Sequence, residues 1–203
     1  VKDLRELTGA GMMDCKKALT ETNGDMDAAV DVLKKSGAAK MEKKQSRIAA
    51  EGIARVAVNG NVAVVAEVNS ETDFVAKNET FQEFVQTVAD TALASDLNGG
   101  ANGEDIEALL ATNGLSDLLV EKTATIGEKL SVRRFAKVTG DAVASYIHGG
   151  GRIGVVIAAD GASDDAAKEA LTNIAMQVAA MNPQYISRND ISAEELAKIK
   201  EIT

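Results

Sequence analysis

The sequence has 203 residues, of which 45% are hydrophobic and 26% charged, which is ordinary usage for one globular domain or two small ones. The longest uncharged apolar run, residues 153–159, is far too short to cross a bilayer, so a membrane protein is not expected. A single cysteine, Cys15, cannot form an internal disulfide, and a single histidine, His148, excludes histidine-rich metal sites. No signal peptide is recognisable at Val1, so a cytoplasmic protein is expected.

The net charge of −9 is unevenly spread along the chain. Residues 1–58 carry 11 basic and 9 acidic side chains, a charge of +2, whereas residues 59–203 carry −11. An acidic body repels phosphate backbones, and with 3% aromatic residues there are few side chains on which bases could stack. Nucleic acid is therefore not expected as a direct partner.

Residues 1–37 contain turn and cap residues that predict three short helices, over residues 1–7, 12–20 and 26–35. Met12, Cys15 and Leu19 recur at helical spacing and are expected to form a buried stripe. Gly37 is expected to end the third helix in a left-handed conformation. Residues 38–52 follow as a basic linker, for which a solvated helix is favoured over a contact with phosphate or an acidic surface.

An alternating pattern begins at Ile53 and predicts a first α+β subdomain over residues 53–139. Residues 54–58 and 61–68 are expected to form a hairpin joined by Asn59-Gly60 in a type I′ turn. Asn78 is a natural N-cap for the next helix. The apolar face of that helix consists of Phe81, Phe84, Val85, Val88 and Ala92. Two more helices, over residues 104–111 and 116–126, and a strand over residues 131–138 complete this subdomain.

The same order of hairpin, polar loop and helix returns in residues 140–203. Strands are expected over residues 142–147 and 153–159, with a glycine turn between them and Ser163 as the cap of the next helix. An offset of 90 residues places Phe81, Phe84 and Val88 over Leu171, Ile174 and Val178, and Met181 continues the second face. The repeat predicts two duplicated antiparallel-sheet-plus-helix subdomains. A short final helix is expected from Ser192 to about residue 199.

Known catalytic patterns are weak in this sequence. Gly149, Gly151 and Gly154 spell GxGxxG, but a strand rather than a helix follows, so a hairpin turn is expected instead of a dinucleotide site. His148 has no serine or cysteine nearby in sequence, which favours a contact role, with a small hydrolase that uses His148 as the alternative. Cys15 is expected to be a buried small side chain rather than a reactive thiol. No catalytic residue, metal site or cofactor is predicted.

A polar loop over residues 70–77 carries an aromatic side chain next to a carboxylate. Ser70 is expected to cap a short turn that has Asp73 at its third position. Phe74 either packs on the core or inserts into a partner, and spacing alone favours the core. Met13 lies about 100° from Met12 around the helix axis, away from the apolar stripe, so it is a candidate contact residue.

Three segments resemble signatures of the bacterial elongation factor Ts family, in the family's order. They are residues 4–19, LRELTGAGMMDCKKAL, residues 67–76, EVNSETDFVA, and residues 145–154, SYIHGGGRIG. The similarity extends over essentially the whole chain, and three long motifs argue strongly against a chance match.

The resemblance implies an α+β fold: a ubiquitin-associated-like helical N-domain over residues 1–37, a linker helix, and a core of two related subdomains, 53–139 and 140–203. It implies nucleotide exchange on elongation factor Tu, without a catalytic group or cofactor in this chain. In the family, the residues matching Asp73 and Phe74 enter the GTPase domain near its magnesium and phosphate site, which overrides the spacing argument for a buried Phe74. The residues matching Met12 and Met13 pack on another helix of that domain.

The resemblance also bears on the remaining contacts and on assembly. Thr72 and Val75 flank the Asp-Phe pair and are expected to contact the partner, while His148 and Gly149 are expected to meet the C-terminal domain of elongation factor Tu. Some members of the family continue into a coiled-coil insertion and a C-terminal helix, whereas shorter ones dimerise through the core, so a longer chain and a homodimer are both open. The alternative function is a protein-interaction module without exchange activity.

Overall fold

Three helices form at the N-terminus of the computed structural model, which describes residues 1–202: α1 (Lys2–Thr8), α2 (Met12–Glu21) and α3 (Met26–Glu42). Gly9 ends α1 with a left-handed φ of 64°. Asp25 caps α3, because its side chain accepts a hydrogen bond from the N–H of Ala28 at 3.0 Å. The small core of this unit consists of Leu4, Cys15, Ala18 and Ala29. The prediction that Cys15 is buried is confirmed.

The third helix does not end at Gly37, so the predicted glycine cap is wrong. Gly37 is buried inside α3 and packs against α7 (Leu115–Ile126), which belongs to the following unit. A Cβ atom at this position would lie 3.1 Å from Cγ1 of Val120. The glycine thus permits a close approach of two helices, a role that the sequence does not distinguish from a helix end. The division of the chain at residues 37, 52 and 139 stays a prediction.

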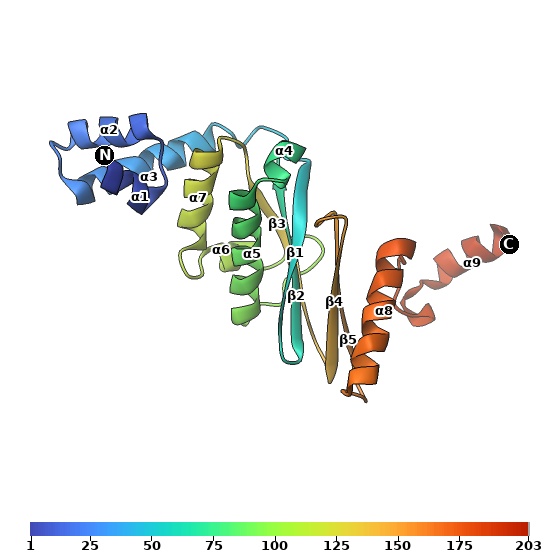
Figure 1. Ribbon diagram of the computed structural model, residues 1–203. Coiled ribbons are helices and arrows are strands. Elements are labelled where there is room, and N and C mark those ends of the chain that lie inside the picture. Colours follow the sequence, from blue (N-terminus) through green and yellow to red (C-terminus); the bar gives the residue numbers. More distant parts are fainter. Residues whose placement is uncertain (203) are drawn as a thin grey trace.

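The alternating segments form an antiparallel sheet in the order β1–β2–β3, with β1 at Glu51–Asn59, β2 at Val62–Ser70 and β3 at Ser131–Thr139. Helix α5 (Glu79–Ala94) covers one face of this sheet (Figure 1). The predicted cap is confirmed, since Asn78 accepts a hydrogen bond from the N–H of Phe81 at 3.2 Å. All five residues of the predicted apolar face are buried in the main core.

The turn of this hairpin lies one residue later than predicted. Asn59 pairs with Val62, which places Gly60 and Asn61 at the two central positions. Of these two, only Gly60 has a positive φ, 59°, and this pattern belongs to a type II′ turn rather than type I′. Asn59 instead ends β1, where it adds one more pair to the ladder.

Short helices occupy the connection between β2 and β3. Helix α4 (Asp73–Ala76) follows β2 directly. Helices α6 (Ile106–Leu110) and α7 precede β3 and lie close to the predicted ranges 104–111 and 116–126. Helix α7 packs on both α3 and α5. It therefore joins the N-terminal helices to the core.

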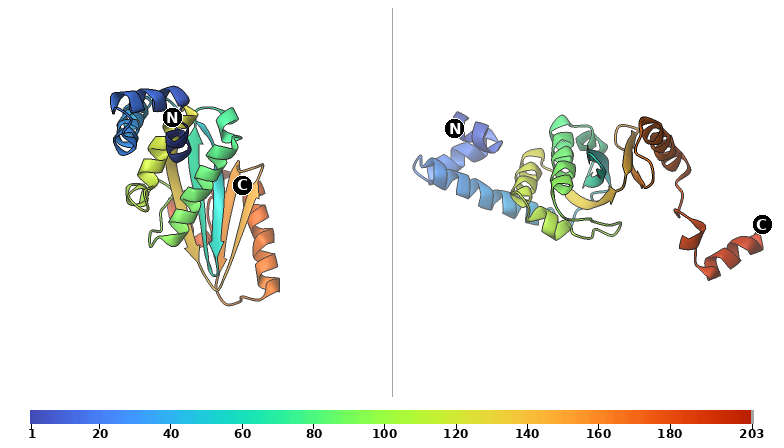
Figure 2. Two further views of the ribbon diagram at one scale, coloured as in Figure 1. Left: turned by 60° about the vertical axis from the view of Figure 1, so that its left-hand side comes forward. Right: turned by 90° about the horizontal axis from the view of Figure 1, so that it is seen from below.

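The second hairpin, β4 (Ala142–His148) and β5 (Ile153–Ala159), forms a two-stranded sheet on the face of the first sheet opposite α5 (Figure 2). Helix α8 (Asp165–Met181) covers the outer side of this hairpin, so the layers run helix, sheet, sheet, helix. The backbone N–H of Ala54 donates to the carbonyl of Gly151 at 2.7 Å and links the two sheets. This arrangement confirms an α+β fold of antiparallel sheets packed with helices.

Two predictions for α8 are wrong. Its cap is Asp164, whose side chain accepts a hydrogen bond from the N–H of Ala167 at 2.8 Å, rather than Ser163. Ile174 and Met181 are 50% and 74% exposed, and the buried positions are Leu171 and Ala175. The reason is that two strands cover a narrower stripe of the helix than its apolar pattern suggests.

The chain then passes through a 3₁₀ helix, η1 (Arg188–Asp190), into α9 (Ala193–Ile202), which extends away from the core (Figure 2). Ser192 accepts a hydrogen bond from the N–H of Glu195 at 3.2 Å, so the predicted start of this helix is confirmed. Within residues 1–202, no helix combines the length and the apolar character needed to cross a membrane.

Candidate partner-binding surface

The chain turns sharply between β2 and α5, and four predicted contact residues lie there: Thr72, Asp73, Phe74 and Val75. Thr72 caps α4, because its Oγ1 accepts a hydrogen bond from the N–H of Val75 at 3.4 Å. Ser70 is fully buried, and its hydroxyl donates to the carbonyl of Thr72 at 3.0 Å. The predicted Ser70 cap is wrong because the helical turn starts two residues further along.

Helix α4 presents an aromatic side chain to solvent and buries its other side. Phe74 is 80% exposed, whereas Ala76 is buried and Val75 packs partly on the main core. Asp73 forms an exposed ion pair with Lys77 at 2.7 Å, and this hydrogen bond lowers the pKa of Asp73 below its usual value. The exposed Phe74 contradicts the spacing argument and agrees with the implication of the resemblance.

Glu128, in the connection between α7 and β3, holds this turn from a distant part of the chain. Its Oε2 accepts hydrogen bonds from the backbone N–H groups of Glu71 and Thr72, both at 3.0 Å. Its Oε1 accepts a hydrogen bond from the hydroxyl of Thr72 at 2.6 Å. Three donors therefore converge on one half-buried carboxylate.

Glu71, which lies in the turn, in return accepts a hydrogen bond from the segment that contains Glu128. Its Oε1 accepts hydrogen bonds from the N–H of Lys129 at 2.6 Å and from Nη1 of Arg47 at 3.2 Å. The bond from Lys129 is the main reason why the pKa of Glu71 is lowered; partial burial opposes this effect and Arg47 adds to it. The ammonium group of Lys129 also donates to the carbonyl of Gln45 at 2.6 Å. We call Glu71, Thr72, Glu128 and Lys129 the reciprocal clamp.

The two methionines at the start of α2 are both exposed, Met12 by 59% and Met13 by 74%. The expectation that Met13 lies off the buried stripe is confirmed, whereas its role as a contact residue stays a prediction. Met12 does not join the buried stripe. It is the first residue of α2 and borders a shallow hollow beside α1 at the edge of the helical unit. Leu7, which is 68% exposed at the end of α1, was not predicted as a surface residue.

His148 ends β4 and is exposed beside the glycine turn. Its Nδ1 lies 2.9 Å from the hydroxyl of Tyr146, and within residues 1–202 it forms no hydrogen bond with a serine, a cysteine or a carboxylate. Gly149, Gly150 and Gly151 all have positive φ angles and lead directly into β5, as predicted for a hairpin turn. The hydrogen-bond partner of His148 is thus the hydroxyl of Tyr146, and not the serine or cysteine that a typical hydrolase activates.

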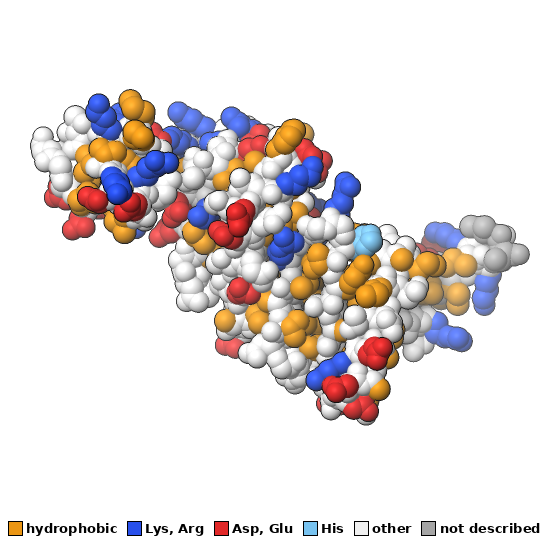
Figure 3. All heavy atoms as spheres, viewed as in Figure 1, with side chains coloured by type: hydrophobic (Ala, Val, Ile, Leu, Met, Phe, Trp, Pro, Cys, Tyr) orange, Lys and Arg blue, Asp and Glu red, His pale blue; other side chains and the backbone are white. Residues whose placement is uncertain are grey.

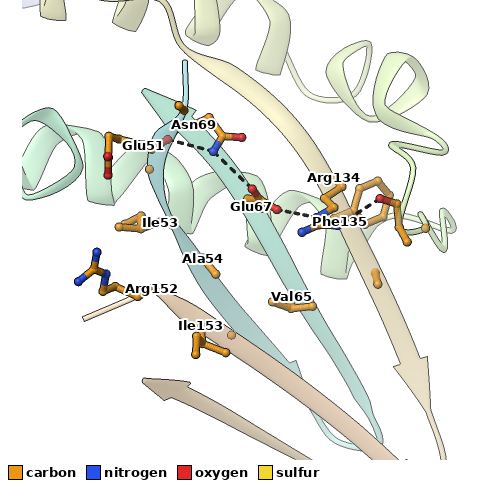
Figure 4. A pocket seen from close by; sticks show the side chains of 17 residues that line it. Glu51, Ile53, Ala54, Val65, Glu67, Asn69, Arg134, Phe135, Arg152 and Ile153 are labelled. Atoms are coloured by element: carbon orange, nitrogen blue, oxygen red, sulfur yellow. Dashed lines mark hydrogen bonds and ion pairs between the residues drawn. The ribbon is translucent and has the colours of Figure 1, made fainter. Parts of the chain in front are cut away.

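An open hollow of about 550 Å³ lies between the first sheet and the glycine turn (Figure 4). On its wall, Nε of Arg134 donates to Oε2 of Glu67 at 2.5 Å, and the side chain of Asn69 donates to the carbonyl of Glu51 at 2.9 Å. These hydrogen bonds link neighbouring strands of the β1–β2–β3 sheet. Over the described part of the chain, no group of three His, Cys, Asp or Glu side chains is placed to hold a metal ion.

The predicted contact residues lie on three separate elements: α2, α4 and the β4–β5 turn. Figure 3 shows hydrophobic side chains at the surface of the N-terminal helices, above α4 and over the second hairpin. Exposed apolar residues spread over separate elements suit a large protein partner better than a small molecule, which binds in one concave site. The reciprocal clamp was missed because its halves are 56 to 58 residues apart and neither contains a recognisable pattern.

A scan against protein-family models matches residues 71–203 to the family described as Elongation factor TS. The match includes the turn at residues 72–75 as well as His148 and Gly149, whereas Met12 and Met13 lie outside it. Since the matched residues make up more than half of the sequence, this chain belongs to the elongation factor Ts family, the nucleotide exchange factors that act on elongation factor Tu in translation elongation and are not catalytic enzymes.

Proposed function

We propose that this exchange factor uses the turn at α4 to disturb the magnesium and phosphate site in the GTPase domain of elongation factor Tu. The observation that carries the proposal is Phe74, a large apolar side chain that is 80% exposed on a turn anchored from two sides. An exposed aromatic side chain gains free energy when a partner buries it, and it loses none of the chain's own packing in doing so.

The physical consequence follows from how a GTPase holds GDP, through a loop that cradles the phosphates and through Mg²⁺. Separating the elements that carry these ligands weakens nucleotide binding. Because coupling between two ligands is reciprocal, bound nucleotide weakens the binding of the exchange factor by the same ratio. The reaction then needs no acid, base or nucleophile from this chain.

Two further surfaces complete the proposed interface. Met12 and Met13, both exposed on α2, would pack on another helix of the GTPase domain, which suits their flexible apolar side chains. His148 and Gly149 would meet the C-terminal domain of the partner. Thr72 and Val75 would contact the partner beside Phe74.

We also propose a cytoplasmic location, because the partner works in translation elongation.

We also propose that the two hairpin-and-helix units arose by duplication, as their common element order and the offset of 90 residues suggest. A homodimer stays a prediction, which sedimentation of the chain alone would test.

The direct test is release of a fluorescent GDP analogue from elongation factor Tu at increasing concentrations of this chain. Phe74→Ala should lower the saturating release rate about tenfold or more, the effect of losing a buried interface aromatic, with an unchanged melting temperature. Ile174→Ala is the matched control, since it removes another exposed apolar side chain from an element outside the proposed interface. A Phe74→Ala variant that still releases GDP at the wild-type rate would refute the proposal that Phe74 disturbs the magnesium and phosphate site.

The same titration distinguishes residues that accelerate GDP release from residues that only hold the partner. Met13→Asp and His148→Ala should raise the concentration needed for half-maximal release by about tenfold, while the saturating rate stays within twofold of wild type. Met12→Asp should behave like Met13→Asp, because both side chains are exposed. A chain that binds elongation factor Tu without accelerating release would support the alternative of a non-exchange interaction module.

A further inference from the structure

The turn that carries Phe74 cannot hold its shape by itself. Helix α4 has only four residues, and a helix of this length is far below the length at which isolated helices are stable in water. The ion pair between Asp73 and Lys77 is exposed, and such pairs contribute little stability. The orientation of Phe74 must therefore come from contacts with the rest of the molecule.

Glu128 provides the most concentrated of these contacts. Its two oxygens take the N–H of Glu71, the N–H of Thr72 and the hydroxyl hydrogen of Thr72, at 3.0, 3.0 and 2.6 Å. Hydrogen bonds to an ionised carboxylate are stronger than those between neutral groups. The turn residues immediately before α4 are thus fixed by one side chain that is not part of the turn.

The hydroxyl of Thr72 connects this anchor to the helix. While it donates its hydrogen to Glu128, it accepts the N–H of Val75 as the N-cap of α4. Since a hydroxyl has one hydrogen and two lone pairs, giving the hydrogen to Glu128 aims a lone pair at the helix. Glu128 therefore acts on the first turn of α4, and on Phe74 within it, through Thr72.

The next residue extends the same anchor toward the N-terminal helices. The ammonium group of Lys129 donates to the carbonyls of Gln45 and Arg47, and the N–H of Lys129 donates to Glu71. Helix α7, which precedes this segment, packs on α3. The connection from residue 127 to residue 130 is therefore the place where the linker, the turn and the core meet.

We infer that Glu128 is a positioning residue for nucleotide exchange: it holds Thr72, and through it Phe74, in the orientation that acts on elongation factor Tu. This inference rests on the proposed role of Phe74. Glu128 is half-buried behind the turn and works through Thr72, so it supplies geometry and not contact area.

The test measures the saturating rate of fluorescent GDP release per folded molecule for Glu128→Gln and Glu128→Ala. Alanine removes all three acceptor contacts and should lower that rate about tenfold, while glutamine keeps one acceptor oxygen and should lie between alanine and wild type. Glu104→Gln is the matched control, because its carboxylate also accepts a loop N–H, that of Asn102 at 2.9 Å, away from α4. It should leave the rate unchanged.

A second pair of variants covers the case in which Glu128→Ala fails to fold. Thr72→Val removes the hydroxyl at nearly constant size and should reduce the saturating rate, whereas Thr72→Ser keeps the hydroxyl and should restore most of it. In the Phe74→Ala background, Glu128→Gln should cause no further loss of rate, because the side chain that it positions is already missing.

The possible failures are distinguishable. If Phe74→Ala slows release but Glu128→Gln and Thr72→Val leave the saturating rate at the wild-type value, the positioning role is wrong and the proposed function stands. An additive loss in the Phe74→Ala background would also overturn it, since Glu128 would then act by another route. If Phe74→Ala itself has no effect, the proposed function fails first.

Discussion

The two hairpin-and-helix units have the same element order and similar apolar patterns, yet they bury different fractions of the apolar side chains of their helices, α5 and α8. In the first unit, Phe81, Phe84 and Val88 of α5 are almost completely buried between a three-stranded sheet and α7. In the second unit, of the residues 90 positions later, Leu171 is buried and Ile174 is half exposed. The difference shows that an apolar pattern marks the side of a helix that can be covered, while the number of packed neighbours decides how much of it is covered.

The largest expected effect comes from truncating the matched pair Phe84 and Ile174. Phe84→Ala leaves a cavity in a closed core and should lower the free energy of unfolding by about 3 to 5 kcal/mol. Ile174→Ala removes a side chain that is 50% exposed and should cost less than about 1 kcal/mol. Denaturant unfolding at two protein concentrations measures both. A large, concentration-dependent loss for Ile174→Ala would mean that a second copy covers α8 in solution.

The two hairpin turns offer a second contrast. Gly151 has a φ of 109°, and a Cβ there would lie 2.9 Å from Cβ of Ile53 and 3.0 Å from the carbonyl oxygen of Ala54. Gly60 has a φ of 59° with open space around it. Gly151→Ala should therefore cost about 3 kcal/mol, from strain and from the loss of the close approach, and Gly60→Ala only about 1 kcal/mol.

Thermal or denaturant unfolding of both glycine variants provides the measurement. Equal losses would show that the second hairpin moves away from β1 at little cost. That result would weaken the view that the Ala54 to Gly151 hydrogen bond fixes the two sheets together.

Local signals in the sequence identified most elements and missed the contacts between them. Asn78 and Ser192 were predicted as caps because a cap depends only on its own next three residues. Gly37 was misassigned because the residue that requires a glycine there, Val120, is 83 positions away. The face of α8 was overestimated for the same reason, since the missing neighbours of Ile174 leave no mark in its own segment.

The residues of the candidate site likewise fall into those that local sequence identified and those that depend on distant contacts. The motif around Phe74 was visible in the sequence, and its exposure followed from the family resemblance rather than from spacing. Met12 was misplaced because helical periodicity does not show that the residue lies at the edge of the bundle. Glu128 left no local signal, because its function in the structure is to satisfy backbone donors of another segment.

A pH titration should show what the carboxylate of Glu71 contributes to the loop of the first unit. The pKa of Glu71 in the folded state is lowered, so its contribution to stability is complete above its ordinary value of 4.5 and is lost as the pH falls through the lower folded value. Glu71→Gln should therefore unfold about 1 kcal/mol more easily than wild type at pH 7, and the two should converge as the pH falls through the lowered folded-state pKa of Glu71. Asp73 and Glu104, whose pKa values are also lowered, keep their share of the pH dependence in both proteins.

The matched control is Asp164→Asn in the second unit, whose side chain caps α8 by accepting the N–H of Ala167 at 2.8 Å. Measured at pH 7, it compares the loss of a local helix cap with the loss of the Glu71 carboxylate. A Glu71→Gln variant whose difference from wild type stays constant as the pH falls would show that the carboxylate charge of Glu71 does not stabilise the clamp.

The smallest expected effect concerns α7, the helix that covers the first unit; in the described part of the chain, α8 has no equivalent cover. Thr123 is 1% exposed, and within residues 1–202 its hydroxyl oxygen has no hydrogen-bond partner. Replacing it by valine keeps the shape of the side chain and removes a polar group that was desolvated without compensation, so Thr123→Val should raise the free energy of unfolding by up to about 1 kcal/mol. Thr125→Val is the control, because the exposed hydroxyl of Thr125 donates to the carbonyl of Gly9 at 3.4 Å and its loss should be neutral or slightly destabilising. Denaturant unfolding of the two variants in parallel measures the difference. If Thr123→Val were the less stable of the pair, the hydroxyl would have a partner in solution, and the tight cover that α7 gives the first unit would include bound water.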